Sequence, residues 1–389
     1  MPSETVKHPN LRLVEIQIEG FKSIQKQTIP LQPLTVLIGA NGAGKSNLVQ
    51  FISMVAHLQT GSLQRWTHLR GGANELLHFG SKNTEVIKAR LDFETGSGRN
   101  FYSFELSPNT NDELVIWNEK VGYQQEGREG YFVVDLQSDA GRESFYSVHK
   151  YGEPPQGFSQ TQLRTADVIG AFLKEFQSFQ FHDTTPEARI RQSSEPHLNR
   201  FLGNNGANLA AWLYRLQVTH PNSFAMIEAT VRRAFPDFGR FELTEDPLNG
   251  KIQFLWQHRH SEGIFRASQF SDGTIRFIAL CALFLQPIEL MPDVILVDEP
   301  ELGLHPTALQ ILSGMAQSVV AQGKQVILTT QSPAFLSTFA PENVVVVERD
   351  GESSVFRSMK DKSDELKEWL VNFESLGALW EMNLLGGKP

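Results

Sequence analysis

The sequence predicts an α/β fold with a mixed or parallel core sheet, an antiparallel β subdomain and a helical lobe. Three observations predict it. Apolar strands alternate with helices near the start of the chain and again after residue 290, which is typical of a parallel sheet covered by helices. Between about residues 85 and 150, short β-like runs separated by turn residues indicate an antiparallel meander. From about residue 162 to 235, helical spacing of apolar residues predominates.

The composition is that of a globular protein. The chain has 389 residues, of which 40% are hydrophobic and 20% charged, enough for one large domain or two smaller ones. The N-terminus lacks the apolar segment of a secretory signal, and no run approaches the roughly 20 apolar residues of a membrane span. We expect the single cysteine, Cys281, in the core of a cytoplasmic protein without a membrane partner. A net charge of -9 argues against a surface that binds nucleic acid throughout, but allows a local basic face.

Residues 11–60 are predicted to form a strand, loop and helix. Residues 11–18 alternate and give a strand with one strongly apolar face, followed by a turn at Gly20. Residues 34–38 are apolar enough for a buried strand, and residues 45–58 carry apolar side chains at helical spacing.

The remaining regions follow in order. The antiparallel subdomain, residues 85–150, is predicted to contain strands at 86–93, 101–106, 114–121, 131–136 and 144–148. The helical lobe, residues 162–290, has its clearest helices at 168–176 and 209–216, extended chain near 240 and at 254–257, and a helix from about Asp272. The core region, residues 291–350, has strands at 294–297, 325–330 and 343–347 and a helix from about Pro306, and residues 351–389 form a C-terminal tail.

A glycine-rich loop directly follows the strand at residues 34–38 and fits the Walker A pattern G-x-x-x-x-G-K-[ST]. Its glycines let successive backbone N–H groups converge on phosphate oxygens, and the helix N-terminus adds a favourable dipole. Lys45 would neutralise the β- and γ-phosphates, and the Ser46 hydroxyl would hold Mg²⁺. The alternative is a glycine-rich turn with a surface lysine. The nucleotide-binding candidates are Gly39, Ala40, Asn41, Gly42, Ala43, Gly44, Lys45, Ser46 and Asn47.

A second motif, Walker B, places two acids at the end of the apolar strand at residues 294–297. Ligands of open α/β sheets bind at the carboxyl ends of strands. Asp298 would hold Mg²⁺ through water, and Glu299 could polarise the attacking water as a general base. Acids at strand ends also serve as helix caps, which is the competing interpretation.

Together these motifs resemble the ABC-type P-loop NTPase heads of the SMC, RecF and OLD-like group, and most closely the bacterial predicted ATPases of AAA type. Residues 298–306 resemble D-E-P-E-x-G-L-H-P, residues 329–333 resemble T-Q-S-P, and residues 21–24 resemble the early F-K-S-[IF] element. Residues 376–387 are similar to the tail of these ATPases. The resemblance covers nearly the whole chain and implies a single ABC-type head with ATP and Mg²⁺ as cofactors, and it adds Lys22 to the nucleotide-binding candidates.

Residues 270–277 resemble the signature motif of the group in its S-[GD]-G-[TQ] form. In the family, the signature serine and glycine reach the γ-phosphate held by the opposite protomer. The resemblance therefore implies that Ser271 and Gly273 bind nucleotide in a head-to-tail homodimer that sandwiches two ATP molecules. A triphosphate can bridge two such surfaces through charge-assisted hydrogen bonds that a diphosphate cannot complete. Capping of the helix by Ser271 or Asp272 is compatible with this role.

Some positions depart from the family pattern or leave alternatives open. Gln331 stands where relatives often have histidine; it can hydrogen-bond a phosphate but cannot accept a proton, so hydrolysis could be slow. It joins Lys45 and Glu299 as a catalytic candidate. The Q-loop glutamine, an additional metal ligand, is assigned to Gln180, with Gln177 as its competitor. His182 and Asp183 are either neighbours of the active site or a helix-capping pair.

Several arginines are weaker candidates. Arg70 occupies a position that resembles the arginine loop of SMC heads, although a solvated surface arginine is the simpler interpretation. The pairs Arg189 with Arg191 and Arg232 with Arg233 either meet phosphate backbones or lie on solvated helix faces.

The sequence therefore favours an ATP-hydrolysing switch that serves DNA repair, chromosome maintenance or anti-phage defence. DNA and a separate nuclease or other effector are its candidate partners. The lack of a long heptad run excludes an SMC-type arm, and the C-terminal TOPRIM nuclease of OLD proteins is expected to be missing, which is the reason for a separate effector. An ATP sensor or scaffold with little turnover is the alternative. A transporter subunit is disfavoured because Lys45 and Ser271 are farther apart along the chain than in that branch.

Overall fold

The computed structural model describes residues 11–387 except 97, 128–129, 137–143, 145–159, 363, 365, 367 and 370–374. The chain divides into two compact units. Unit 1 comprises Met1–Gln177, Glu342–Glu365 and Leu385–Pro389, and unit 2 comprises Ser178–Pro341 and Leu366–Leu384. Among the described residues, no helix is long and apolar enough to cross a bilayer.

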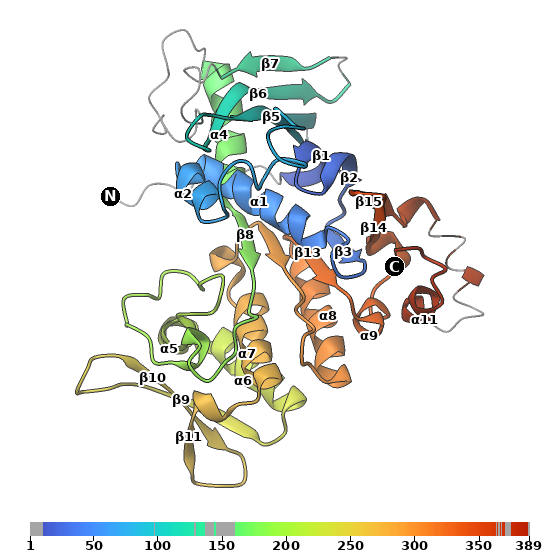
Figure 1. The fold of residues 1–389 in the computed structure, drawn as a ribbon. Helices are drawn as coiled ribbons and strands as arrows, with labels where there is room; N and C mark the ends of the chain where they lie inside the picture. Colours follow the sequence, from blue (N-terminus) through green and yellow to red (C-terminus); the bar gives the residue numbers. More distant parts are fainter. Residues whose placement is uncertain are drawn as a thin grey trace. The chain divides into compact units, whose positions relative to one another are not determined.

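Unit 1 contains an antiparallel sheet with the strand order β2-β1-β4-β5-β6-β7. Helix α4 (Gln160–Lys174) lies against β5 and β6 and contacts α1 (Lys45–Gln59) (Figure 1). The strands are β1 (Arg12–Phe21), β2 (Ile24–Pro30), β4 (Ile87–Thr95), β5 (Gly98–Pro108), β6 (Leu114–Gln125) and β7 (Phe132–Asp135). The predicted strand at 144–148 falls, apart from Ser144, outside the described residues.

Two details of this sheet differ from the sequence prediction. The first strand pairs with β4, with Ile16 opposite Leu91, so β1 and β2 belong to the antiparallel sheet that was expected to begin at residue 85. A register shift between Leu13 and Glu15 changes the alternation, so that Leu13 and Ile16 are both buried. The strand also continues past Gly20 to Phe21, and the hairpin turns at the next two residues.

A second group of strands in unit 1 carries the glycine-rich loop. Strand β3 (Leu34–Ile38) is buried at every residue and pairs in parallel with β14 (Val344–Asp350), while β15 (Ser353–Ser358) pairs antiparallel with β14. Helix α1 begins immediately after the loop, and α2 (Leu63–His68) follows it. The parallel pairing places the carboxyl ends of β3 and β14 at the same edge.

Unit 2 combines parallel strands with helices. Strand β12 (Val294–Val297) pairs in parallel with β13 (Gln325–Thr330), all of whose residues are buried, and β8 (Phe176–Phe179) spans the boundary between the units. Helix α7 (Asp272–Phe284) is buried at every residue after Asp272 and lies beside α8 (Pro306–Ala321) (Figure 1). Cys281 is fully buried in α7, which confirms its expected place in the core.

The rest of unit 2 completes the helical lobe. A three-stranded antiparallel sheet precedes α7, and the Trp256 ring of this sheet stacks on Phe270, just before α7, with ring centroids 4.7 Å apart. Its strands are β9 (Phe238–Glu245), β10 (Ile252–His258) and β11 (Ile264–Arg266). The other helices are α5 (Leu209–Thr219), α6 (Pro221–Ala234), α9 (Pro333–Leu336) and α11 (Leu376–Glu381). Short 3₁₀ turns, some at the unit boundary, occur at Arg189–Arg191, Ala267–Gln269, Ile288–Leu290, Pro341–Asn343 and Lys360–Lys362.

Candidate functional site

The glycine-rich loop connects β3 to α1 and orients Lys45. The Lys45 side chain is buried, and its Nζ donates hydrogen bonds to the carbonyl oxygens of Gly39 at 2.6 Å and Ala40 at 3.0 Å. Gly44 has a φ of 116°, and a Cβ added there would lie 2.1 Å from the Ser354 Oγ. Glycine is therefore required at position 44. The carbonyls of Gly39 and Ala40 fix the direction of the Lys45 ammonium group.

Two serines that the sequence analysis did not identify support the loop. The Ser354 Oγ, which is fully buried, donates to the Ala43 carbonyl at 2.6 Å and lies 2.6 Å from the Ser23 Oγ. The Asn47 Nδ2 in turn donates to the Ser23 Oγ at 2.5 Å. Ser23 and Ser354 are 331 residues apart, so only the position of Ser23 within the F-K-S-I element signals this role. Ser46, the candidate metal ligand, is exposed.

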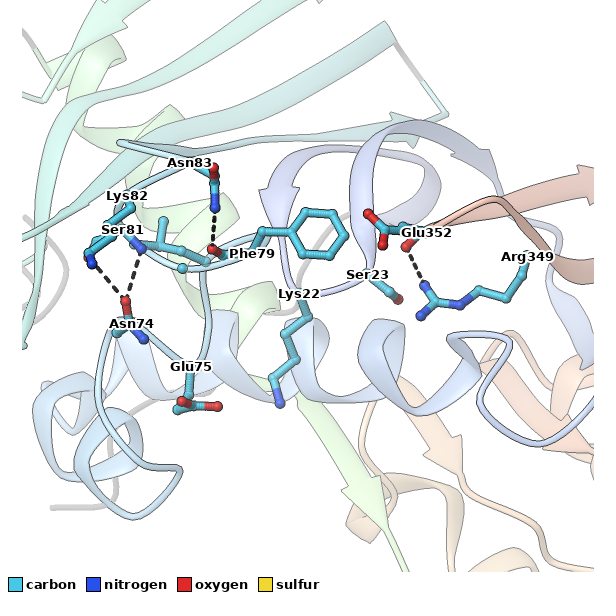
Figure 2. Close-up of a pocket in the computed structure, with 12 residues that line it drawn as sticks. Lys22, Ser23, Asn74, Glu75, Phe79, Ser81, Lys82, Asn83, Arg349 and Glu352 are labelled. Atoms are coloured by element: carbon cyan, nitrogen blue, oxygen red, sulfur yellow. Dashed lines mark hydrogen bonds between the residues drawn. The ribbon is translucent and has the colours of Figure 1, made fainter.

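A cavity of about 620 Å³ lies beside this hydrogen-bonded group. Ser23 belongs to the group and also lines the cavity. Lys22, with a positive φ of 48°, and the half-exposed ring of Phe79 also line it (Figure 2). Burial lowers the pKa of Lys22, Arg70 lowers it further, and Glu75 raises it. The cavity therefore offers both an aromatic face and ionisable groups next to the loop.

Arg70 is half-buried rather than fully solvated. Its guanidinium lies 4.1 Å from the centre of the Trp66 ring, and burial lowers its pKa. A cation over an indole face is a favourable arrangement, so Trp66 accounts for the position of Arg70 without any ligand.

The carboxylate of Asp298 is held from both sides in unit 2. The Thr329 Oγ1 donates to its Oδ1 at 2.5 Å, and the Gln180 Nε2 donates to its Oδ2 at 3.1 Å. The Asp298 backbone N–H donates to the Phe179 carbonyl at 3.1 Å, and the His182 Nε2 lies 3.0 Å from the Asp298 carbonyl oxygen. The structure thus brings Gln180, His182 and Asp298 together. Asp298 itself is buried, with 5% of its surface exposed.

Glu299 and Gln331 are hydrogen-bonded to each other. The Gln331 Nε2 donates to the Glu299 Oε1, and the Glu299 backbone N–H donates to the Thr329 Oγ1 at 3.0 Å. Glu299 has a φ of 43°, an uncommon conformation for a residue other than glycine. The turn after β12 therefore aims the candidate base at Gln331.

Glu301 anchors the same segment and was not assigned a role from the sequence. It accepts hydrogen bonds from the Thr330 Oγ1 at 2.5 Å and the Gln331 backbone N–H at 3.0 Å. Its side chain is buried, and burial raises its pKa. Glu301 thereby fixes the backbone from which Gln331 reaches Glu299.

The signature segment begins α7. Ser271 caps the helix by accepting a hydrogen bond from the Thr274 N–H at 3.1 Å, which confirms the capping interpretation. A Cβ added to Gly273 would lie 2.1 Å from the Gly303 carbonyl oxygen, so glycine permits the close approach of α7 to this turn. Asp272 forms an ion pair with Arg191 at 2.6 Å.

Two buried arginines hold the signature segment in place. Arg191 donates to the carbonyls of Thr184, Ala267 and Phe270 as well as to Asp272, so its interpretation as a solvated or phosphate-contacting residue was wrong. Arg276, which the sequence analysis missed as a structural residue, donates to carbonyls at Phe181, His182 and Leu302. Each arginine donates to several backbone carbonyl groups at once and so fixes the segments that surround the start of α7.

The candidate metal ligands suit magnesium. Ser46, Asp298 and Gln180 each offer an oxygen, which is the donor that Mg²⁺ prefers. Among the described residues, no group of three or more His, Cys, Asp and Glu side chains could hold a metal ion.

Comparison with known sequences identifies relatives of the whole head. A family model described as "AAA domain, putative AbiEii toxin, Type IV TA system" matches residues 34–337. The Old nuclease of Escherichia phage P2 is 23% identical over 92% of this chain, and the chain spans 62% of that protein's length. Structural maintenance of chromosomes protein 1 of Schizosaccharomyces pombe is 28% identical over 29% of this chain and 10% of its own length.

Two solved structures have the same fold. The SMC head bound to the C-winged helix domain of ScpA has a TM-score of 0.59 and 15% identity, covering 88% of this chain and 97% of that one. The Pyrococcus furiosus Smc head with an extended coiled coil, bound to the C-terminal domain of ScpA, has a TM-score of 0.54 and 14% identity, covering 92% and 99%. The predicted ABC-type head fold is thus confirmed by its likeness to the SMC heads, and the chain belongs to the family described as AAA domain, putative AbiEii toxin, Type IV TA system.

Proposed function

We propose that this protein binds and hydrolyses Mg-ATP and that two copies close head to tail around two nucleotides. The observation that carries the proposal is the pair of preorganised groups: Lys45 oriented by two carbonyls, and Glu299 aimed by Gln331 beside a fixed Asp298. Lys45 neutralises the phosphates, and Ser46, Asp298 and Gln180 hold Mg²⁺. Within each of these two groups the charge is held in a fixed position, as phosphoryl transfer requires of the groups that take part in it.

The hydrolytic step depends on Glu299. Mg²⁺, when bound, neutralises charge that develops on the phosphate oxygens. Glu299 accepts a proton from the attacking water, and the Gln331 amide keeps the accepting oxygen in place. Gln331 cannot accept the proton itself, so we expect it to position groups rather than to act as an acid or base.

In this proposal the nucleoside binds in the cavity beside the glycine-rich loop. The cavity of Figure 2 adjoins Asn47 and Ser354 through Ser23, and Phe79 exposes 52% of its surface there. An exposed aromatic ring can stack on a base, and Lys22 is a cation at the same cavity. The aromatic ring favours a nucleotide over inorganic phosphate as the ligand, and the cation would attract the phosphates of either.

Dimer closure would use the signature segment. Ser271 and Asp272 are exposed at the start of α7, where the helix N-terminus attracts anions. Ser271 and Gly273 are proposed to meet the γ-phosphate held by the partner protomer. The phage relative is named a nuclease, and for this reason we include DNA and a separate nuclease or effector as candidate partners in repair or anti-phage defence.

Light scattering after size-exclusion chromatography of Glu299→Gln, with and without Mg-ATP, tests the switch. The amide retains size but cannot take a proton, so hydrolysis should fall roughly 10²- to 10⁴-fold while ATP accumulates in a closed dimer. Lys45→Ala, treated identically, should remain monomeric. Wild-type turnover in Glu299→Gln would refute the assignment of the base.

The same runs with duplex DNA address the partner. Co-elution with DNA supports a role in repair or genome surveillance, and co-purification of an effector from the native host supports the defence role. A folded Glu299→Gln protein that binds ATP but stays monomeric in every condition favours the alternative function, an ATP sensor or scaffold with little turnover.

A further inference from the structure

Residues 385–387 run against the glycine-rich loop within unit 1. Leu385 is buried, and Gly386 and Gly387 have positive φ values of 79° and 80°. The Gly387 carbonyl oxygen accepts a hydrogen bond from the backbone N–H of Ala40 at 3.2 Å. The segment belongs to the C-terminal tail, for which the proposed reaction has so far provided no role.

Glu348 holds this segment in place. The Gly387 N–H donates to the Glu348 Oε2 at 3.1 Å, and Arg357 forms an ion pair with the other carboxylate oxygen at 2.7 Å. Glu348 lies in β14 next to Val347, whose carbonyl oxygen would be 2.2 Å from a Cβ added to Gly39. Strand β14 therefore passes close to the first residue of the loop and also carries the carboxylate that binds the tail.

The tail and Lys45 share one peptide group as a partner. The carbonyl of the Gly39–Ala40 peptide accepts from the Lys45 Nζ at 2.6 Å, and the N–H of the same peptide donates to the Gly387 carbonyl. Hydrogen bonds at the two ends of a peptide polarise it and strengthen each other. The orientation of the carbonyl that directs Lys45 is thus fixed from behind by Gly387.

We propose that Glu348 and Gly387 are positioning residues of the nucleotide site, which act through the Gly39–Ala40 peptide to hold Lys45 ready for the β- and γ-phosphates. This inference rests on the proposed function, because it requires ATP to bind at Lys45. It extends the site to residues outside the Walker A pattern. Loss of one such backbone hydrogen bond should weaken ATP binding roughly threefold to tenfold.

Calorimetric titration of ATP and ADP into full-length variants tests the inference. Glu348→Ala removes the acceptor for the Gly387 N–H, and Gly387→Pro removes the donor and cannot adopt a φ of 80°. Both should raise the Kd for each nucleotide by the stated factor. Glu348→Gln keeps an acceptor oxygen and should bind close to wild type. Glu94→Ala, which removes a surface carboxylate paired with Arg12 in the same unit, is the matched control and should change nothing.

A double-mutant cycle with Lys45→Ala separates positioning from general loosening of the fold. If the tail acts through Lys45, Glu348→Ala has little further effect once Lys45 is absent. Wild-type affinity in both folded tail variants, or full additivity with Lys45→Ala, overturns the inference while leaving ATP binding intact. Absence of ATP binding in the folded wild-type protein instead refutes the proposed function and the inference with it.

Discussion

The glycine-rich loop after β3 and the acidic turn after β12 both follow a buried parallel strand, but different interactions hold them. In the loop, Lys45 is directed by backbone carbonyls only five and six residues away. In the acidic turn, Asp298 and Glu299 are directed by side chains 30 to 118 residues away in the sequence. The direction of Lys45 is therefore set by local backbone groups, although Ser354 and Gly387 support the loop from distant parts of the chain. The turn is a network of side chains assembled by the fold.

This difference determines which substitutions should disrupt the glycine-rich loop and which should disrupt the acidic turn. Glycine and backbone groups shape the loop, so most of its chemistry depends on a single side chain, Lys45. The acidic turn depends on several buried polar groups at once, and such networks lose more than one hydrogen bond when a member is removed. Substitutions can test this contrast separately in each unit.

Lys45→Ala should have the largest effect on ligand binding and little effect on folding. Removing the buried cation deletes the counter-charge of the phosphates, and we expect the Kd for ATP to rise roughly 100-fold, about 2 to 3 kcal/mol. Calorimetric titration measures the affinity, and thermal unfolding checks the fold. Lys26→Ala, which removes an exposed lysine paired with Glu19 in the same unit, is the control. An equal loss in both variants would contradict a specific role for Lys45.

Arg276→Met should destabilise the protein. The substitution leaves the carbonyls at Phe181 and Leu302 without their buried donor, and we expect a loss of about 2 to 4 kcal/mol in unfolding free energy. Denaturant unfolding followed by fluorescence measures it. Arg215→Met removes an arginine that also donates to two carbonyls but is half-exposed, and it should cost less. Equal losses in the two variants would argue against a network centred on Arg276.

The sequence predicted the glycine-rich loop but not most of the hydrogen bonds that hold the acidic turn after β12. The loop was predictable because its residues are contiguous, follow an apolar strand and have few alternative functions. Walker B was predictable as a strand end with two acids, and Gln180 and Gln331 were named as candidates of the same site. The hydrogen bonds from Thr329 and the anchoring by Glu301 were not predictable, because nothing local links these side chains to the acids. The signature helix was predicted, whereas the buried donors at its start were not.

The buried arginines and the pairing of β1 show why the sequence alone does not reveal these contacts. Charged residues in a sequence are normally solvated, so burial of Arg191 and Arg276 is visible only when α7 is packed. Strand β1 was recognised from its alternation, but its pairing with β4 depends on a register shift that alternation alone does not reveal. Local pattern therefore predicts the element, and packing decides its partners.

Ser354→Ala should have a moderate effect on both the stability of the protein and its affinity for ATP. The hydroxyl is the donor to the Ala43 carbonyl, so its removal should cost about 1 kcal/mol in unfolding free energy and weaken ATP binding a few-fold. Ser353→Ala removes the neighbouring, more exposed hydroxyl, which bonds to Gln25, and serves as the control. If Ser354→Ala changed stability without changing affinity, Ser354 would support the fold but not the loop.

Glu301→Gln should have the smallest effect, a change in how stability depends on pH. Burial raises the pKa of Glu301, hydrogen bonds from Thr330 and Gln331 lower it, and the Glu299 charge raises it. Because its folded pKa lies above the unfolded value, wild-type stability should fall as pH rises from the ordinary carboxyl range through the folded pKa.

The Glu301→Gln side chain does not titrate and still offers an oxygen to Thr330. The variant should therefore gain stability relative to wild type as pH increases, in denaturant unfolding measured from about pH 4 to pH 8. Glu289→Gln, at an exposed position of unit 2, should show no such trend. A parallel pH profile for Glu301→Gln and wild type would mean that the hydrogen bonds offset burial completely, and that the acidic turn tolerates a buried charge as readily as a surface tolerates one.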